Sequence, residues 1–469
     1  MESYEDLRKI ERENLKTIFQ SNPELFKKQT YVDDQEILNN IGIELDNYER
    51  PEVFLKFWPE DFIVEELGFN NRVQTIDLPK KVEQIPNESR VYRATLVKFN
   101  ISTLDAVKDM VRQTNSDIGK IKYAGIKDKV AITAQEITFK DINYSQIKNI
   151  SSKYYFLKDI KPKKSAVSAG QLEGNRFTLF LRTKEKISEE NLSILENKIS
   201  EISNEGFLNF YYIQRFDVNR LINWHWGLLI LKGEYEKTIH HYLTYPGKTG
   251  WAHIHNIRKE VLDIYGDWSE IKNKLSKFPL IFRNEIVILE HLEKNPDDYF
   301  GALQAISDQS SLWVKAYASY IFNLKLSQLS KESSDLPDSL PLLLSTNPEV
   351  QELYKDILEK HEVYPINFEN IKSLRGISFQ DYKVKTREKV IFKHASNTPN
   401  GFLLQFELNK GSYATTLLSQ LFTLVAGFPP NEYSDIHFNT TKAVDGRDIG
   451  EITQHFEGLS GSPRDLNFE

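Results

Sequence analysis

Hydrophobic positions recur along the chain at two spacings, one typical of strands and the other of helices. A period of two covers three segments: DFIVEEL (61–67), VYRATLVKF (91–99) and NRFTLFLRT (175–183). A helical period covers two more: STLDAVKDMVRQT (102–114) and EENLSILENKISEISNEG (189–206). Ser102 or Thr103 is placed to cap the first helix, and Gly206 to end the second. Strands and helices that follow one another without a strict strand–helix–strand rhythm predict an α+β fold.

The middle of the chain is richer in helical patterns, which predicts a second module inserted into the first. Within it, SLWVKAYASYIFNLKL (311–326) carries an apolar stripe. Strand-like alternation returns at GFLLQFEL (401–408), followed by a turn and a helix from about Tyr413. We therefore expect five segments: an N-terminal helical extension (1–48), the first part of the main domain (49–234), the inserted domain (235–388), the second part of the main domain (389–430) and a C-terminal extension (431–469).

Composition limits the size, compartment and chemistry of the protein. With 469 residues, of which 40% are hydrophobic, the chain can form two or three domains with real cores. It contains no cysteine, which excludes disulfides, thiolate nucleophiles and cysteine-based zinc sites and fits a reducing cytosol. The charged N-terminal sequence lacks a signal-peptide core, and no apolar run approaches the roughly 20 residues of a membrane helix. We expect a cytoplasmic protein without a membrane partner.

The net charge of −7 and the pI of about 5.9 do not indicate a uniformly basic, nucleic-acid-binding surface. A net charge is only an average, however, and the segment 153–177 concentrates cations among aromatic residues. Such a mixture suits an RNA backbone and unstacked bases, although a solvated lysine-rich loop is the more ordinary interpretation. The cations that would meet RNA are Lys161, Lys163, Lys164 and Arg176.

The sequence gives little indication of a metal site, a nucleotide site or a pair of catalytic carboxylates. The pairs His240-His241 and His253/His255 lack the helical spacing of a two-histidine zinc motif. Neither a GxGxxG motif nor a P-loop is present, so we expect no metal and no small-molecule cofactor. The acids of PEDFIVEEL (59–67) would serve a glycosidase only if two of them lay at a set separation across a sugar.

The stretch YAGIKDKVAITAQ (123–135) holds one carboxylate, Asp128, between Lys127 and Lys129. Strand-like sequence on both sides makes Gly125–Lys129 a tight connection, most simply a polar hairpin turn. A nucleophilic carboxylate must stay ionised, and neighbouring lysines favour the charged form. The residues permit a catalytic role for Asp128 without selecting it.

Six stretches, taken in order, resemble the TruD family of tRNA pseudouridine synthases: KFWPEDFIVEELGF (56–69), KYAGIKDKVAITAQ (122–135), GNRFTLFLR (174–182), GFLNFYYIQRFD (206–217), AYASYIFN (316–323) and FELNKGSYATTLL (406–418). The resemblance spans roughly Phe54 to Leu421, and the second and fourth stretches are highly specific together. It implies a pseudouridine-synthase core, with a mixed and largely antiparallel sheet flanked by helices. It also implies an inserted TruD-type α+β domain that forms the other wall of an RNA cleft.

The resemblance implies a cofactor-free conversion of uridine to pseudouridine in tRNA, typically at uridine-13 of the D arm. By position, Asp128 matches the catalytic carboxylate and Lys56 the basic residue that pairs with it. Asn209 matches an asparagine of the family's site, and Tyr211 matches an aromatic residue close to the target base. In many members of the family that aromatic residue is phenylalanine. An ionised Asp128 would attack C1′ or base C6, or remove a proton that leads to a glycal, on a flipped-out nucleotide. The expected RNA contacts are Lys127, Lys129, Lys161, Lys163, Lys164, Arg176, Gln214 and Arg215.

Departures from the family pattern concern RNA contacts and target position more than reaction type. Tyr212 and Asp217 stand where glycines are common, and Ser419-Gln420 replaces an Arg-Glu pair. We expect a monomeric tRNA pseudouridine synthase. The main alternative is a catalytically silent RNA-binding or tRNA-chaperone protein on the same scaffold.

Overall fold

The computed structural model describes residues 4–45, 48–69, 72–79, 89–247, 249–344, 347–377, 382–456, 458–459 and 461–466. The chain packs into two compact units. The sheet unit comprises Tyr48–Phe207 and Glu388–Asp465. The helical unit comprises Met1–Asn47, Leu208–Arg387 and Leu466–Glu469.

A large mixed sheet forms the framework of the sheet unit, with strands in the order β16-β2-β9-β3-β7-β5-β8. Strand β9 also pairs with β15, which pairs with β14, while β4 and β6 pair with β3 and β7. The pairs β3/β7 and β16/β2 are parallel, and the other pairings described for this unit are antiparallel. The predicted α+β fold with a mixed, largely antiparallel sheet is therefore confirmed. The strands are β2 (Glu52–Phe54), β3 (Phe62–Gly68), β4 (Arg72–Val73), β5 (Val91–Phe99), β6 (Ile121–Tyr123), β7 (Ile132–Lys140), β8 (Tyr155–Pro162), β9 (Gly174–Arg182), β14 (Val390–Thr398), β15 (Gly401–Asn409) and β16 (Thr423–Ala426).

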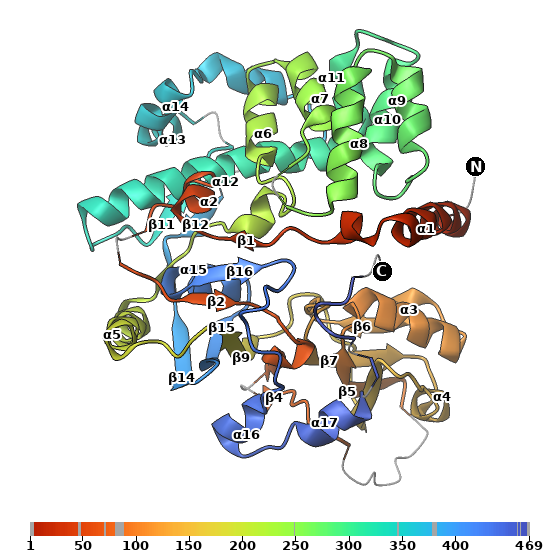
Figure 1. Cartoon of the computed structure of the whole chain (residues 1–469), viewed down its shortest axis with the longest axis vertical. Helices are drawn as coiled ribbons and strands as arrows, with labels where there is room; N and C mark the ends of the chain where they lie inside the picture. Colours follow the sequence, from red (N-terminus) through yellow and green to blue (C-terminus); the bar gives the residue numbers. More distant parts are fainter. Residues whose placement is uncertain are drawn as a thin grey trace. The chain divides into compact units, whose positions relative to one another are not determined.

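Helices cover both faces of the β5 region (Figure 1). On one face, Ala94 and Leu96 of β5 share a buried cluster with α3 (Thr103–Thr114) and α4 (Tyr144–Lys148). On the other, Val97 and Phe99 share a cluster with α17 (Gly450–His455) and Phe456. This alternation follows from the two-residue period of a strand. The remaining helices of this unit are α5 (Glu189–Glu205), α15 (Ala414–Leu421) and α16 (Thr440–Asp445).

Two predicted helix ends are confirmed in detail. The Ser102 hydroxyl accepts the backbone N–H of Asp105 at 3.0 Å, which selects Ser102 over Thr103 as the cap of α3. Helix α5 ends at Gly206, whose φ of 87° is easily reached by a residue without a Cβ. Local sequence therefore sets these boundaries, whatever the helices pack against.

The C-terminal segment is tied to the sheet by a buried arginine. Arg182 of β9 donates two hydrogen bonds to the carboxylate of Asp61, at 2.6 and 2.9 Å. Its remaining amino group donates to the carbonyl oxygens of Ser434 and Ile436, at 2.7 and 2.9 Å. Both side chains of the Arg182–Asp61 pair are fully buried. The predicted C-terminal extension thus includes a segment that is an integral part of the sheet unit.

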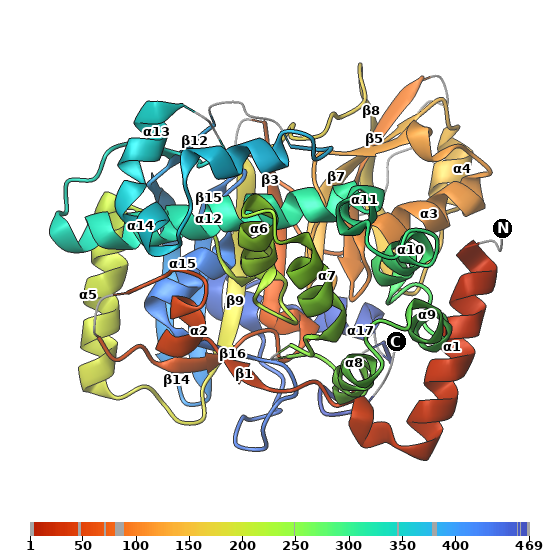
Figure 2. The ribbon, with the colours of Figure 1, turned by 90° about the horizontal axis from the view of Figure 1, so that it is seen from above.

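Helices dominate the other unit, and α12 (Ser307–Glu332) is its long helix (Figure 2). About half of the α12 side chains are buried. Helix α6 (Asn223–Leu231) packs closely on α12, where Gly227 lies against the backbone of Trp313 and leaves no room for a Cβ. The other elements are α7 (Tyr235–Thr244), α8 (Ala252–Asp263), α9 (Trp268–Leu275), α10 (Arg283–Leu292), α11 (Tyr299–Ala305), β11 (Ser339–Pro341), α13 (Pro348–Leu353), α14 (Lys355–Lys360), η6 (Pro365–Ile371) and β12 (Lys383–Lys385).

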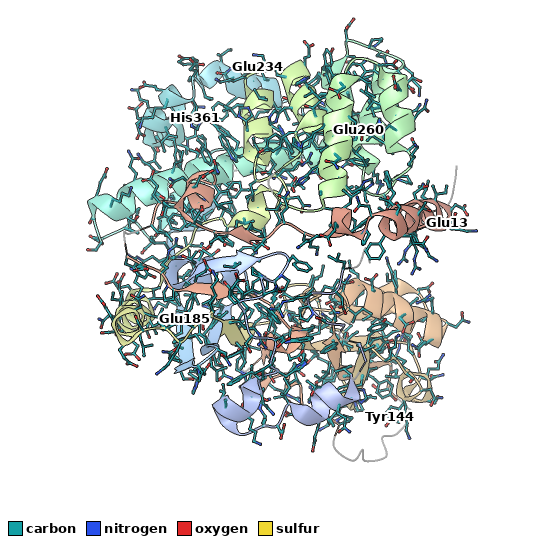
Figure 3. All side chains as sticks on the ribbon, viewed as in Figure 1. Glu13, Tyr144, Glu185, Glu234, Glu260 and His361 are labelled. Atoms are coloured by element: carbon teal, nitrogen blue, oxygen red, sulfur yellow. The ribbon has the colours of Figure 1, made fainter. Side chains whose placement is uncertain are left out.

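His361, which is labelled in Figure 3, belongs to a set of stacked aromatic rings from several elements of this unit. It follows α14 and stacks on Tyr320 of α12, with ring centroids 5.8 Å apart. Tyr320 in turn stacks on Trp224 of α6 at 3.9 Å. Burial lowers the pKa of His361, so the ring is neutral at neutral pH and packs as an aromatic group.

The N-terminal segment packs on the helical unit through polar and apolar contacts. Glu11 of α1 (Tyr4–Ser21) accepts the backbone N–H groups of Leu280 and Ile281, at 2.8 and 2.9 Å. Phe26 in the 3₁₀ turn η1 (Pro23–Phe26) is buried, with its ring centroid 5.3 Å from that of Trp251. Helix α1 ends just before Pro23, and the N-terminal extension forms part of a compact unit.

Candidate active site

Three strand ends meet at one edge of the sheet and determine where Asp128 lies. Strands β3 and β7 are parallel with Ile63 opposite Ile132, so the residues that precede both strands emerge at the same edge. Strand β5 is antiparallel to β7 with Lys98 opposite Thr133, so β5 ends at this edge too. Lys56 precedes β3, Asp128 precedes β7 and Lys98 is near the end of β5. Residues far apart in sequence are thereby brought together.

Lys56 and Asp128 form an ion pair at this edge. The Lys56 ammonium donates a hydrogen bond to Asp128 Oδ1 at 2.5 Å, and the two side chains are 25% and 40% exposed. The same ammonium lies 4.0 Å from the centre of the Phe62 ring. The carboxylate is therefore held by a cation yet remains open to a ligand. The group paired with Asp128 is thus a lysine, and not the second carboxylate that a glycosidase would need.

The backbone of Lys56 adopts a left-handed conformation, with φ of 61°. This region is uncommon for a residue with a long side chain, and such strain is often found at functional sites. Here it accompanies the turn between β2 and the 3₁₀ turn η2 (Pro59–Asp61), from which the ammonium reaches Asp128.

The loop that carries Asp128 is longer than the tight turn predicted from sequence. Strand β7 begins at Ile132, so the connection from β6 covers residues 124–131. Side chains hold its backbone: Gln135 donates to the carbonyl of Gly125 at 2.9 Å, and the Thr103 hydroxyl accepts the N–H of Lys127 at 3.0 Å. Thr103 also donates to Gln135 at 3.0 Å, which links the two anchors. Hydrogen-bonding side chains, which a turn propensity does not register, thus shape this loop.

The two lysines beside Asp128 have different environments. Lys127 is buried and forms an ion pair with the buried Glu66 at 2.7 Å. Its expected contact with RNA phosphate is therefore not supported, because the ammonium is already committed inside the protein. Lys129 is exposed and stays a candidate for a phosphate contact. Neither neighbour replaces Lys56 as the cation on the Asp128 carboxylate.

Lys98 is a further basic group at the site, and sequence reasoning missed it. Its side chain is fully buried, and its ammonium donates a hydrogen bond to the main-chain carbonyl of Asp128. Burial lowers the pKa of Lys98 to about 7, helped by the charges of Lys127 and Lys56 and opposed by Asp128. A lysine near the end of an alternating strand is usually solvated, so only the three-dimensional contact reveals it.

The basic stretch from the end of β8 to the start of β9 is only partly available to a ligand. Lys161 and Lys164 are exposed. Lys163 is half-buried and forms an ion pair with Glu136. Arg176 donates two hydrogen bonds to Oε2 of the buried Glu65, at 2.9 and 2.6 Å. The expected RNA contact of Arg176 is therefore not supported by its surroundings.

Asn209 and Tyr211 belong to the helical unit. Asn209 is half-buried and donates to the carbonyl of Lys385 at 3.0 Å. Tyr211 is also half-buried, with its ring 5.6 Å from that of Phe322 in an edge-on arrangement. The guanidinium of Arg215 lies 4.8 Å from the centre of the Tyr211 ring, while Gln214 is exposed. Arg215 thus supports the ring by a cation–π contact.

Asn323, the last residue of the AYASYIFN stretch, fixes the backbone of Tyr211. Its amide oxygen accepts the Tyr211 N–H at 2.9 Å, and its amide nitrogen donates to the Tyr211 carbonyl at 2.7 Å. The same nitrogen donates to the carbonyl of Ile41 at 2.7 Å. Asn323 is fully buried on α12, so the contact is well shielded from water. An asparagine inside a helical apolar pattern is the signal that could have found it.

Two departures from the family pattern have a structural explanation. Asp217, which stands where glycine is common, has φ of 63°, a conformation that aspartate tolerates better than most residues. Its carboxylate accepts from Arg220 at 2.9 Å. Tyr212 donates its hydroxyl proton to buried Asp33 at 2.7 Å. The N-terminal extension therefore supplies the hydrogen-bond partner of the Tyr212 hydroxyl.

Other kinds of site find little support within the part of the chain that the structure describes. There, no group of three or more His, Cys, Asp or Glu side chains is placed to hold a metal ion. Among the same residues, no helix combines the length and apolar character needed to cross a membrane.

Comparisons with known proteins place these observations in a family. A family model described as tRNA pseudouridine synthase D (TruD) matches residues 45–341. A Methanococcus maripaludis protein named "Probable tRNA pseudouridine synthase D" is 28% identical over 82% of this chain and 98% of its own. A relative of the same name from Methanococcus vannielii is 29% identical over 79% of this chain and 94% of its own.

A solved structure shares the fold. The crystal structure of a protein from Methanosarcina mazei, assigned to tRNA pseudouridine synthase D (TruD), aligns with a TM-score of 0.67 at 24% identity. The alignment covers 82% of this chain and 98% of that chain. The family model spans more than half of the sequence, and the motifs around Asp128 lie inside it. The chain belongs to the tRNA pseudouridine synthase D (TruD) family, whose members are isomerases that form pseudouridine.

Proposed function

We propose that this protein isomerises uridine to pseudouridine in tRNA, at uridine-13 of the D arm, with Asp128 as the reacting carboxylate. The observation that carries the proposal is the Lys56–Asp128 ion pair of 2.5 Å at a sheet edge, in a chain of the TruD family. The Asp128 side chain is 40% exposed, so a ribose can reach it.

The reaction moves one bond without an external reactant. The glycosidic bond between N1 and C1′ breaks, the uracil turns, and C5 bonds to C1′. The C5 proton then leaves while N1 gains a proton, so atoms and electrons balance. Whether the carboxylate bonds to C1′ or removes the ribose proton that leads to a glycal, it must be an anion. Lys56 pairs with that carboxylate and holds one of its oxygens in place.

The roles of Asn209 and Tyr211 are proposed from the family motif that contains them. Tyr211 stacks on the target base, and its phenol assists removal of the C5 proton. Asn209 hydrogen-bonds to the same nucleotide. A uridine inside a helix is inaccessible, so the nucleotide is extruded before reaction. Gln214 and Arg215 support this motif, Arg215 through its contact with the Tyr211 ring.

For tRNA binding, we propose that the exposed cations Lys129, Lys161 and Lys164 contact phosphates. Phosphate contacts position a nucleic acid without reading its sequence. We further propose that the protein acts as a monomer in the cytoplasm, where its substrate tRNA is found.

The decisive experiment measures pseudouridine by mass spectrometry in a tRNA that lacks it, after incubation with wild type or Asp128→Asn. Wild type is expected to form the product at position 13, and Asp128→Asn to form none. Asp141→Asn is the matched control, because this acid of the same unit pairs with the exposed Arg90 at 3.3 Å, on the protein surface. A tRNA with cytidine at position 13 should stay unmodified.

Equal product from wild type and Asp128→Asn would remove Asp128 from the mechanism. Product at another position would correct the target uridine while leaving the reaction in place. Tight tRNA binding without any product from wild type would instead support the silent RNA-binding alternative.

A further inference from the structure

We propose that Lys98 is a positioning residue for Asp128: it grips the main-chain carbonyl of Asp128 and so sets the direction in which the carboxylate projects. The inference rests on the proposed function, in which Asp128 is the reacting group. It adds a second basic residue to the site, with a role different from that of Lys56.

Two lysines hold opposite ends of the same residue. Lys56 donates to the side-chain oxygen Oδ1, whereas Lys98 donates to the main-chain oxygen. The Lys56 side chain is 25% exposed, and Lys98 is fully buried on β5. A buried donor has few alternative positions, because the close-packed interior fixes its side chain. Lys98 is therefore a rigid anchor, while Lys56 is the half-solvated group that meets the reacting end.

The remaining anchors of the loop do not replace this contact. Gln135 holds the carbonyl of Gly125, and Thr103 holds the N–H of Lys127. These bonds fix the backbone before Asp128, and the bond from Lys98 fixes the carbonyl that follows its Cα. Without Lys98 the Asp128 carbonyl loses this hydrogen bond, and the peptide unit after Asp128 is less restrained, with the next backbone bonds at Lys129 and Ala131. Rotation there swings the carboxylate, since both share the same Cα.

The surroundings of Lys98 indicate that its hydrogen bond, and not its positive charge, positions Asp128. The groups that face it are Asp128, Lys127 and Lys56, and Lys127 is itself paired with Glu66. Burial brings the pKa of Lys98 to about 7, so at neutral pH much of it is an uncharged amine. An amine still donates to a carbonyl. The positioning effect should therefore be present on both sides of this pKa.

The test compares Lys98→Met with Lys158→Met under single-turnover and steady-state conditions on the same tRNA. Lys158 is the matched control: it is also buried and donates to a main-chain carbonyl, that of Asp77, at 2.6 Å. The charged groups that face it are Asp77, Asp159, Glu65 and Arg447, and Asp128 is not among them. Methionine matches the length of lysine and keeps its apolar stem.

We expect Lys98→Met to lower kcat by ~10- to 100-fold, the range in which small misplacements of a reacting group fall. KM should change less than about threefold, because no substrate contact is removed. The loss should be similar at about pH 6 and pH 8.5, on either side of the Lys98 pKa of about 7. Lys98→Arg, which keeps a donor, should recover part of kcat, and Lys158→Met should retain it.

Hydrogen exchange distinguishes a local loss of order around Asp128 from a general folding defect. In Lys98→Met, peptides that cover residues 124–131 should exchange faster while those of β7 stay protected. A kcat for Lys98→Met equal to that of Lys158→Met, with Asp128→Asn inactive, would overturn this inference alone. An effect confined to KM would overturn it too. Inactive wild type or active Asp128→Asn would overturn the proposed function, and this inference with it.

Discussion

Replacing Arg182 with methionine is expected to destabilise the sheet unit by ~3–5 kcal/mol at neutral pH, the cost of breaking a buried ion pair from one side. The variant leaves the Asp61 carboxylate buried with one remaining partner, the N–H of Trp58 at 3.0 Å. It also removes both donors to the carbonyls of Ser434 and Ile436. A folded domain has only about 5–15 kcal/mol of stability, so this loss is a large share of the total.

The pH dependence of the loss follows from Asp61. Burial raises its pKa from 3.8 to about 6, although Arg182 and the Trp58 N–H lower it. A raised carboxyl pKa means that the folded state binds more protons than the unfolded state between these values. Stability from this group therefore falls as pH rises from about 4 to about 6. Without the guanidinium the pKa rises further, so the deficit of Arg182→Met should be larger at pH 8 than at pH 5.

Hydrogen exchange measured by mass spectrometry is the suitable assay, because a chain of two compact units need not unfold in one step. Peptides from β9 and from residues 431–438 report on the sheet unit alone. The double variant Asp61→Asn/Arg182→Met should recover part of the loss, since it buries no unpaired charge. A deficit below about 1 kcal/mol that does not change with pH would refute the reasoning, since an exposed pair costs no more than that.

Three further outcomes are expected. Lys127→Met should destabilise the sheet unit by ~3 kcal/mol through the unpaired Glu66, and Lys127→Met/Glu66→Gln should restore most of that stability, measured by hydrogen exchange of β3 peptides. Asn323→Ala should lower kcat on tRNA and speed amide exchange at Tyr211 without abolishing folding, because two backbone bonds of Tyr211 are lost. The pKa of Lys98 falls from 10.5 to about 7 on folding, so the unfolded state binds more protons between these values. Stability should rise with pH across that window in wild type, and Lys98→Met should lack this rise in urea midpoints.

The pattern of the sequence predicted the elements well, because their determinants are local. The cap at Ser102 and the end of α5 at Gly206 each depend on one residue and its neighbours. The mixed α+β fold was also predicted, together with the return of strands after a helical insert. The pairing of the strands could not be predicted, since nothing in 61–67 or in 130–139 indicates that β3 and β7 run parallel.

The candidate site was accessible from sequence only through the resemblance. Pattern alone favoured a hairpin turn at Asp128, and it offered Lys127 and Lys129 as its cations. The ion pair with Lys56 is present as the resemblance implied, while the catalytic role of Asp128 is a proposal. The role of Lys98 was not predicted, because the sequence pattern of a strand is the same whether the ammonium of its lysine contacts solvent or a buried carbonyl. Burial and long-range contact decide that difference, and neither is written in a local pattern.

The discontinuity of the sheet unit has a consequence for synthesis on the ribosome. Strand β9 can pair with β15 only after β15 has been synthesised. Arg182 can bind the carbonyl of Ile436 only after a further 254 residues have been added. At about 5–20 residues per second that interval is roughly 13–50 s. The helical unit, apart from its last four residues, is translated before the second half of the sheet emerges. A nascent chain therefore carries a half-built sheet with an unpaired strand edge for tens of seconds, and such an edge can pair with another chain.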